Sequence, residues 1–147
     1  LFNTLPQHRL IIIGEGSEKQ RLQAQSAPNI EFLGRQPDSI VREHLQNCRA
    51  LLFPGCDDFG IVPVEAMAAG KPVIALRQGG ATETVAEGKT GIFFDTPEKK
   101  SFEKALIAFF QQEKNFDAEK IAQHTEQFSE KVFREKILEE VEKMKIS

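Results

Sequence analysis

The sequence predicts an α/β protein whose helices cover a doubly wound, parallel β-sheet. Short apolar runs, most of them ended by glycine or proline, alternate along the chain with segments whose apolar residues recur every three or four positions. The runs contain almost no polar residues, which is typical of strands buried on both faces of a sheet. Strands that alternate with helices imply right-handed crossovers between parallel strands.

Five apolar runs are expected to form the strands. The first, HRLIIIG, is continuous and ends in a GEG turn, and the fourth, PVIAL, precedes a pair of glycines. The second is closed by Gly34, and the third is stopped by Pro54 and Gly55. The predicted strands span residues 8–14, 30–33, 50–53, 72–76 and 91–94.

The segments between these strands are expected to be helical. Ser17 is a candidate N-cap for a short polar helix, and Pro37 with Asp38 begins a longer helix with one apolar face. Phenylalanine and alanine residues at helical spacing then predict a helix that faces the core. The predicted helices span 18–26, 37–48, a segment from about 61, 81–86, 102–110 and 118–126.

The chain is expected to end in an amphipathic helix. Ser129 as its N-cap would place Phe128 against Phe133 in a hydrophobic staple. The apolar stripe of this helix is formed by Val132, Phe133, Ile137, Val141 and Met144.

Length, charge and cysteine content exclude several classes of protein. At 147 residues, we expect one domain that spans 1–147. The net charge of −3 gives no electrostatic reason to expect nucleic acid as a partner. No apolar run approaches the roughly 20 residues of a transmembrane helix. Cys48 and Cys56 are too widely spaced for a metal knuckle or a CxxC pair, so we expect reduced thiols in a cytoplasmic protein.

The stretch FPGCDDFGIVPVEAMAAG, residues 53–70, is the strongest candidate for a binding site. A strand end, a loop with Asp57 and Asp58, and a helix that begins near Ile61 follow one another. Gly60 allows close approach of the backbone, and first-turn N–H groups favour a negatively charged or hydroxyl-rich ligand. Glu65 stands among apolar residues, so we expect a buried carboxylate that needs a hydrogen-bonding partner.

Each of these features also has a simpler interpretation. Gly14-Glu15-Gly16 resembles the start of a dinucleotide fingerprint, but Lys19 occupies the place of the third glycine, so a plain strand-to-helix turn is the simpler alternative. The acidic pair could bind a divalent metal, be solvated, or cap the following helix through Asp58. Glu65 could form an ion pair.

Because a parallel sheet binds ligands at the carboxyl ends of its strands, four loops compete for the crevice. They span residues 14–17, 34–37, 54–60 and 77–81. Arg77 lies at the same edge and is placed to contact a phosphate.

The stretch DDFGIVPVEAMAAGKPVIALRQGGATETVAEGKTGIFF resembles the donor-binding half of the family 4 glycosyltransferases of GT-B fold. Those enzymes carry an E-x7-E motif in the same strand–loop–helix context. Asp57 falls on the first acidic position, where Asp is one methylene shorter than Glu, and Glu65 falls on the second. Weaker similarity extends from RLIIIGEG through IEFLG to the final helix. The resemblance therefore implies a Rossmann-like C-terminal domain.

The resemblance also implies the roles of individual residues. Asp57 and Glu65 would be the catalytic pair, with Glu65 accepting hydrogen bonds from the ribose and Asp57 contacting the transferred sugar. Backbone N–H groups of Phe59, Gly60 and Ile61 would meet the sugar or the distal phosphate. Transfer would proceed with retention and without a metal or cofactor, through positioning and stabilisation of the departing diphosphate.

The remaining contacts to the donor would come from the start of the chain. Gly34 and Arg35 would flank the base, and Gly16 would line the diphosphate. The donor would be a GDP- or UDP-linked hexose, with mannose favoured, and the acceptor a glycan or a lipid-linked sugar.

In the family, a strand followed by an Arg and a Lys that clamp the phosphates precedes the helix whose tail resembles LFNTLPQ. Neither that strand nor an acceptor-binding domain is found in this sequence. We therefore expect a fragment of a two-domain enzyme, whose full length could associate with the inner face of a membrane. If the strand order is 3-2-1-4-5-6, the missing strand falls between 10–13 and 50–53, and five parallel strands remain.

Two alternatives remain open on the sequence alone. One is a non-catalytic, Rossmann-like nucleotide-binding module. The other is a structural interaction domain that binds no nucleotide.

Overall fold

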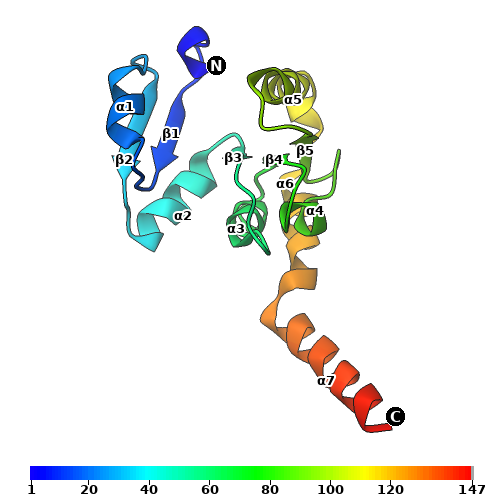
Figure 1. Ribbon diagram of the computed structural model, residues 1–147. Coiled ribbons are helices and arrows are strands. Elements are labelled where there is room, and N and C mark those ends of the chain that lie inside the picture. Colours follow the sequence, from blue (N-terminus) through cyan, green and yellow to red (C-terminus); the bar gives the residue numbers. More distant parts are fainter. Residues whose placement is uncertain (147) are drawn as a thin grey trace. The chain divides into compact units, whose positions relative to one another are not determined.

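The structure is a computed structural model that describes residues 1–146, with the side chains of residues 1–144 (Figure 1). The chain divides into two compact units, Leu1–His44 and Leu45–Ser147, and each is described by itself. The single domain expected for 1–147 stays a prediction.

The first unit contains a pair of parallel strands. Strand β1 (Leu10–Ile13) pairs with β2 (Ile30–Gly34), with Leu10 opposite Ile30 and Ile12 opposite Phe32. The Asn29 carboxamide donates to the carbonyl oxygens of Phe2, Leu5 and His8, at 3.0, 3.1 and 2.8 Å, and so ties the start of the chain to β2. The other elements are η1 (Phe2–Thr4), α1 (Lys19–Ala24) and the first part of α2 (Asp38–Asn47).

The second unit is built on a sheet of three parallel strands. Strand β4 (Val73–Leu76) lies between β3 (Leu51–Phe53) and β5 (Gly91–Phe94). Helix α3 (Ile61–Ala68) packs on β3 and β4, and α5 (Lys99–Gln112) packs on β4 and β5. The remaining elements are α4 (Ala81–Thr84), η2 (Glu113–Asn115), α6 (Ala118–His124), η3 (Thr125–Phe128) and α7 (Glu130–Ile146).

The core of the second unit is centred on its sheet. All residues of β4 and β5 are buried, as predicted for strands covered on both faces. Ala105, Leu106 and Phe109 are the buried residues of α5, which confirms a helix that faces the core. The residues of β1, in contrast, are only half-buried, because a two-stranded sheet offers few neighbours to cover both faces.

The prediction of an α/β fold with five parallel strands is confirmed. The strands pair as β1-β2 and as β3-β4-β5, which are the neighbours expected from the order 3-2-1-4-5-6 without its first strand. In its own sheet, each of β1 and β3 pairs with one strand of the described residues and so lies at an edge of that sheet.

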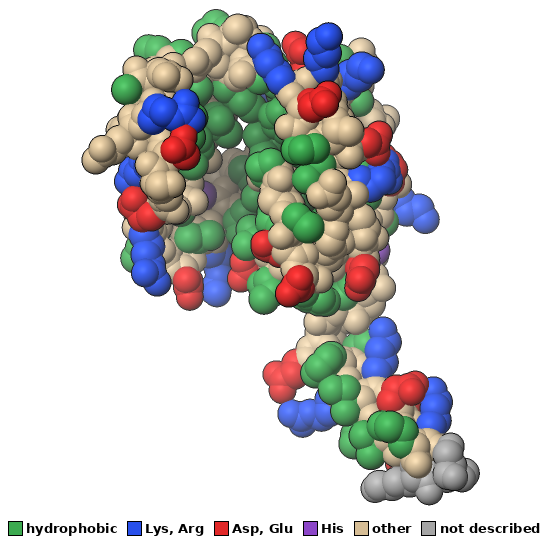
Figure 2. Space-filling view, in the orientation of Figure 1, with side chains coloured by type: hydrophobic (Ala, Val, Ile, Leu, Met, Phe, Trp, Pro, Cys, Tyr) green, Lys and Arg blue, Asp and Glu red, His purple; other side chains and the backbone are tan. Residues whose placement is uncertain are grey.

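Helix α7 leaves most of its predicted apolar stripe exposed. The Val132 N–H donates to Ser129 Oγ at 3.4 Å, which is consistent with the predicted N-cap. The hydrophobic staple is wrong, because Phe128 packs against Phe59 and His124 while Phe133 is 64% exposed. Ile137, Val141 and Met144 are exposed too, and Figure 2 shows apolar side chains gathered on this helix.

Within residues 1–146, no helix combines the length and apolar character needed to cross a membrane.

Candidate functional site

The loop of residues 54–60 joins the carboxyl end of β3 to the N-terminus of α3. It ends at Gly60, a buried residue that is the N-cap of α3 and has φ 74° and ψ 55°. This left-handed conformation favours glycine, because a Cβ atom would crowd the following carbonyl group. Asp58 makes no side-chain capping bond, so its predicted capping role is wrong.

Backbone donors gather where this loop meets the helix. Among the described residues, the N–H groups of Phe59, Gly60 and Ile61 have no hydrogen-bond acceptor. First-turn N–H groups lack intrahelical partners, and the positive end of the helix dipole lies at the same place. The N-terminus of α3 is therefore able to bind an anionic group.

Two acidic side chains lie near these donors. Asp57 and Glu65 are exposed, and the carboxylate of neither forms a hydrogen bond or an ion pair within the described part of the chain. The burial expected for Glu65 is wrong, because α3 turns Pro63, Ala66 and Met67 inward. Glu65 instead shares the outer face with Ile61, one helical turn from the unpaired N–H groups.

A glycine turn supports the loop from the adjacent strand. The N–H of Gly80, which follows β4, donates to the carbonyl oxygen of Asp57 at 2.8 Å. The sequence pointed to this turn through its two adjacent glycines at a strand end. It gave no sign that the turn binds the acidic loop.

Arg77 does not present a free charge to a ligand. Its guanidinium donates to Asp95 and to Glu87, each at 2.7 Å, and lies 4.6 Å from the centre of the Phe93 ring. The hydrogen bonds to Asp95 and then to Glu87 raise the pKa of Arg77 above its ordinary value. The predicted phosphate contact is therefore replaced by a link between the segments that follow α4 and β5.

Three predicted site residues belong to the first unit. Gly34 (φ 70°) accepts a hydrogen bond from the Gly14 N–H at 2.8 Å, which places the end of β2 beside the 14–16 turn. The Glu15 carboxylate accepts from Lys19 Nζ at 2.8 Å and from the Arg35 N–H at 3.2 Å. These contacts lower the pKa of Glu15, with the hydrogen bond from Lys19 as the larger cause. Gly16 is exposed, and the space where its side chain would be is open.

The structure thus groups the predicted residues into two sets. Gly16, Gly34 and Arg35 surround Glu15 in the first unit, and the second set surrounds the N-terminus of α3. That second set consists of Asp57, Phe59, Gly60, Ile61 and Glu65.

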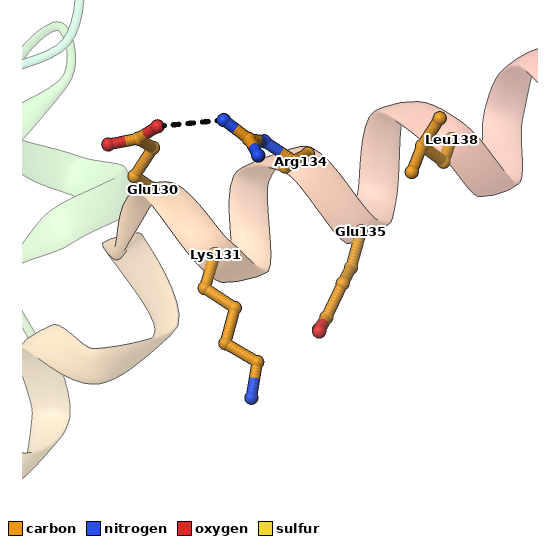
Figure 3. A pocket seen from close by; sticks show the side chains of 5 residues that line it. All are labelled: Glu130, Lys131, Arg134, Glu135 and Leu138. Atoms are coloured by element: carbon orange, nitrogen blue, oxygen red, sulfur yellow. Dashed lines mark hydrogen bonds and ion pairs between the residues drawn. The ribbon is translucent and has the colours of Figure 1, made fainter.

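A shallow hollow elsewhere in the second unit has no part in this site. Figure 3 shows that all five side chains lining it belong to α7, including the ion pair between Glu130 and Arg134. A single helix cannot enclose a ligand, so we assign none to this hollow. Among the described residues there is also no cluster of three or more His, Cys, Asp or Glu side chains able to hold a metal ion.

The fold agrees with that of solved glycosyltransferases of GT-B type. The structure of HepE from Anabaena, determined in complex with UDP and glucose, superimposes with a TM-score of 0.72 at 25% sequence identity. The match covers 95% of this chain and 42% of HepE.

The chain belongs to the family of glycosyl transferases group 1, whose model matches residues 2–131. The expected family 4, GT-B relationship is therefore confirmed. The α-1,3/1,6-mannosyltransferase ALG2 of Dictyostelium discoideum is 49% identical over 63 residues, which are 42% of this chain and 15% of that protein. An uncharacterised glycosyltransferase of Methanocaldococcus jannaschii is 28% identical over 138 residues, 90% of this chain and 39% of its relative. The chain thus spans well under two thirds of these curated relatives.

Proposed function

We propose that this chain is the nucleotide-sugar-binding half of a retaining glycosyltransferase. In the proposed reaction, a hexose, with mannose favoured, moves from a GDP- or UDP-linked donor to a glycan or lipid-linked acceptor. One observation carries the proposal: unpaired backbone N–H groups at the start of α3 lie next to two exposed carboxylates, Asp57 and Glu65, that have no partner among the described residues.

This combination suits a ligand that is anionic at one point and rich in hydroxyl groups at others. A carboxylate accepts two hydrogen bonds from a vicinal diol, and backbone N–H groups donate to phosphate oxygens. In the proposal, Glu65 binds the ribose, Asp57 binds hydroxyls of the transferred sugar, and the N–H groups of Phe59, Gly60 and Ile61 meet the distal phosphate. Family membership and the ALG2 relative support this assignment.

The first unit contributes the base and diphosphate contacts in this proposal. Gly34 and Arg35 flank the base, and Gly16 lines the diphosphate, because a glycine with open space around it leaves room for a phosphate. Glu15 supports this role by anchoring the Arg35 N–H.

Catalysis by the whole protein would rest on positioning and on stabilisation of the departing diphosphate. We propose that the N–H groups of α3 meet the diphosphate charge without a metal. We also propose that the chain, 1–147, acts with an N-terminal acceptor-binding domain of the same enzyme. The full-length protein would be cytoplasmic, and a lipid-linked acceptor would bring it to the inner face of the membrane.

Calorimetric titration tests the proposal. UDP-, GDP- and ADP-sugars, with NAD as the comparison, are titrated into the chain with magnesium and with EDTA. We expect one sugar nucleotide to bind more tightly than NAD and equally in both buffers. A preference for NAD would favour the nucleotide-binding module, and binding that vanished with EDTA would replace the metal-free site with a metal site.

A further inference from the structure

The loop that carries the proposed phosphate donors is packed against the turn after β4 through backbone atoms. Besides the hydrogen bond from Gly80 to Asp57, Gly60 lies against the same turn. A Cβ atom added to Gly60 would lie 3.4 Å from the Ala81 nitrogen and 3.5 Å from the Gly80 carbonyl carbon. The two backbones are thus in contact over several residues.

Position 80 needs a glycine because of its contact with Phe59, and not because of its backbone dihedral angles. Its φ of −61° and ψ of −20° are available to any residue. A Cβ atom at position 80, however, would fall within 3.0 Å of the Cα, carbonyl carbon and oxygen of Phe59, closer than real Cβ atoms come. At Gly79, which has φ 59°, a Cβ atom would lie 2.5 Å from the Asp57 oxygen.

The side chain of Phe59 is held from a second direction. Its ring meets the Phe128 ring edge-on, with 6.2 Å between centroids and 83° between planes. Phe128 in turn meets the His124 ring at 5.8 Å. His124 Nε2 lies 2.8 Å from the carbonyl oxygen of Thr84, so Nε2 must carry the proton in this hydrogen bond.

Together these contacts connect the Phe59 backbone to the Phe59 side chain through helix α4. Helix α4 begins after Gly80 and ends at Thr84, which is buried. One end of α4 therefore contacts the Phe59 backbone, and the other end reaches the Phe59 side chain through His124 and Phe128. The same short helix thus restrains the loop at both places.

We infer that Gly79, Gly80 and Phe128 are positioning residues that orient the Phe59–Gly60 peptide toward the phosphate of the donor. The carbonyl group of Phe59 and the N–H of Gly60 belong to one planar peptide unit, so displacement of the carbonyl also turns the N–H. The inference rests on the proposed function, because the N–H matters only if an anion binds there.

The test compares Gly80→Ala with Gly55→Ala. Gly55 lies in the same loop, its φ is not positive, and an added Cβ atom would approach nothing closer than 3.9 Å. Binding of the nucleoside monophosphate, the diphosphate and the sugar nucleotide is measured in the uridine series (UMP, UDP, UDP-glucose) and the guanosine series (GMP, GDP, GDP-mannose). Amide NMR shifts of Phe59, Gly60 and Ile61 are followed in the same titrations.

We expect Gly80→Ala to weaken the diphosphate and the sugar nucleotide by about tenfold, the effect of losing one hydrogen bond to a charged group. The monophosphate should bind as before, and Gly55→Ala should match the wild type for all three ligands. Phe128→Leu keeps an apolar side chain but removes the ring contact. It should show the same ligand pattern with a smaller loss, and it covers the case in which Gly80→Ala fails to fold.

The outcomes separate the two proposals. A wild-type chain that binds no sugar nucleotide overturns the proposed function and this inference with it. A wild type that binds, together with variants that bind equally well or lose all three ligands to the same extent, overturns the inference alone. Diphosphate-induced shifts at the Phe59–Ile61 amides that persist unchanged in Gly80→Ala also overturn it.

Discussion

Glu65 and Asp57 differ in where they lie relative to the unpaired N–H groups, and this difference predicts separate effects on binding. Glu65 is on α3, one turn beyond the helix start, whereas Asp57 is in the loop before it. A nucleoside diphosphate contains the ribose that Glu65 is proposed to bind. It lacks the sugar that Asp57 is proposed to bind.

Glu65→Ala should weaken binding of both the nucleoside diphosphate and the sugar nucleotide by about 1.5–3 kcal/mol, the range for a hydrogen bond to a charged group. Isothermal calorimetry measures the change. Glu103→Ala, on α5, is the matched control, because its carboxylate also makes no ion pair or hydrogen bond among the described residues. Unchanged affinity in Glu65→Ala would contradict the ribose contact.

Asp57→Ala should weaken only the sugar nucleotide and leave the nucleoside diphosphate unaffected. The neighbouring Asp58→Ala is the control, because Asp58 is also exposed and carries the same charge. If both aspartate variants lost the same affinity for both ligands, the effect would be one of loop charge and the assigned sugar contact would be wrong.

At the level of elements, Arg77 joins two segments of the second unit. Arg77→Ala should lower the free energy of unfolding by about 1 kcal/mol, because an exposed guanidinium gains little from each of its two ion pairs and from its contact with the Phe93 ring. Urea unfolding at low and at high salt measures it. Salt should reduce the loss without abolishing it, since the contact with the Phe93 ring is less screened than the two ion pairs.

Lys89→Ala, an exposed lysine in the turn before β5, is the control for this variant. It should change the free energy of unfolding little at either salt concentration. A loss in Arg77→Ala that is the same at every salt concentration would exclude the ion pairs as its source.

Strands and the core-facing helix could be predicted from the sequence because their signals are local. A continuous apolar run such as 72–76 is stable only when it is removed from water, and all residues of β4 are buried in the structure. The face that α3 turns outward could not be predicted in this way. Glu65 is flanked by apolar residues on every side, so the sequence has no polar stripe that shows the outer face.

Phe128 illustrates a second limit of local reasoning. The staple predicted with Phe133 uses a partner five residues away, whereas the actual partners, Phe59 and His124, are brought together by the fold. The docking of Gly80 on Phe59 likewise depends on β3 and β4 being neighbours. The residues of the candidate site were proposed from the sequence and stay a prediction, whereas the contacts that hold its loop could be seen only in the structure.

At the scale of the whole molecule, the chain forms one part of a larger enzyme in our proposal. Strands β1 and β3 each lie at an edge of their own sheet. The structure and the match to solved glycosyltransferases agree on the parallel α/β architecture, which topological rules predicted from the order of elements alone.

We expect the 147-residue chain to bind a sugar nucleotide weakly and to transfer no sugar by itself. Helix N-termini contribute only up to about 1 kcal/mol each to an exposed anion, and the chain holds no second wall for an acceptor in our proposal. A radiolabelled assay, with and without magnesium, measures sugar transfer. Full-length ALG2 of Dictyostelium discoideum is the positive control. Transfer to an acceptor by the isolated chain would contradict the proposal that a separate domain binds the acceptor.

The edge contact between Phe59 and Phe128 offers a position for a fluorescent probe of the loop. The sequence contains no tryptophan and no tyrosine, so the native chain has almost no intrinsic fluorescence at the wavelengths used for proteins. A Phe128→Trp variant would carry a single emitter against the ring of Phe59. Any ligand that shifts the loop would change the emission of that one indole, so stopped-flow mixing could time the arrival of a ligand without a label.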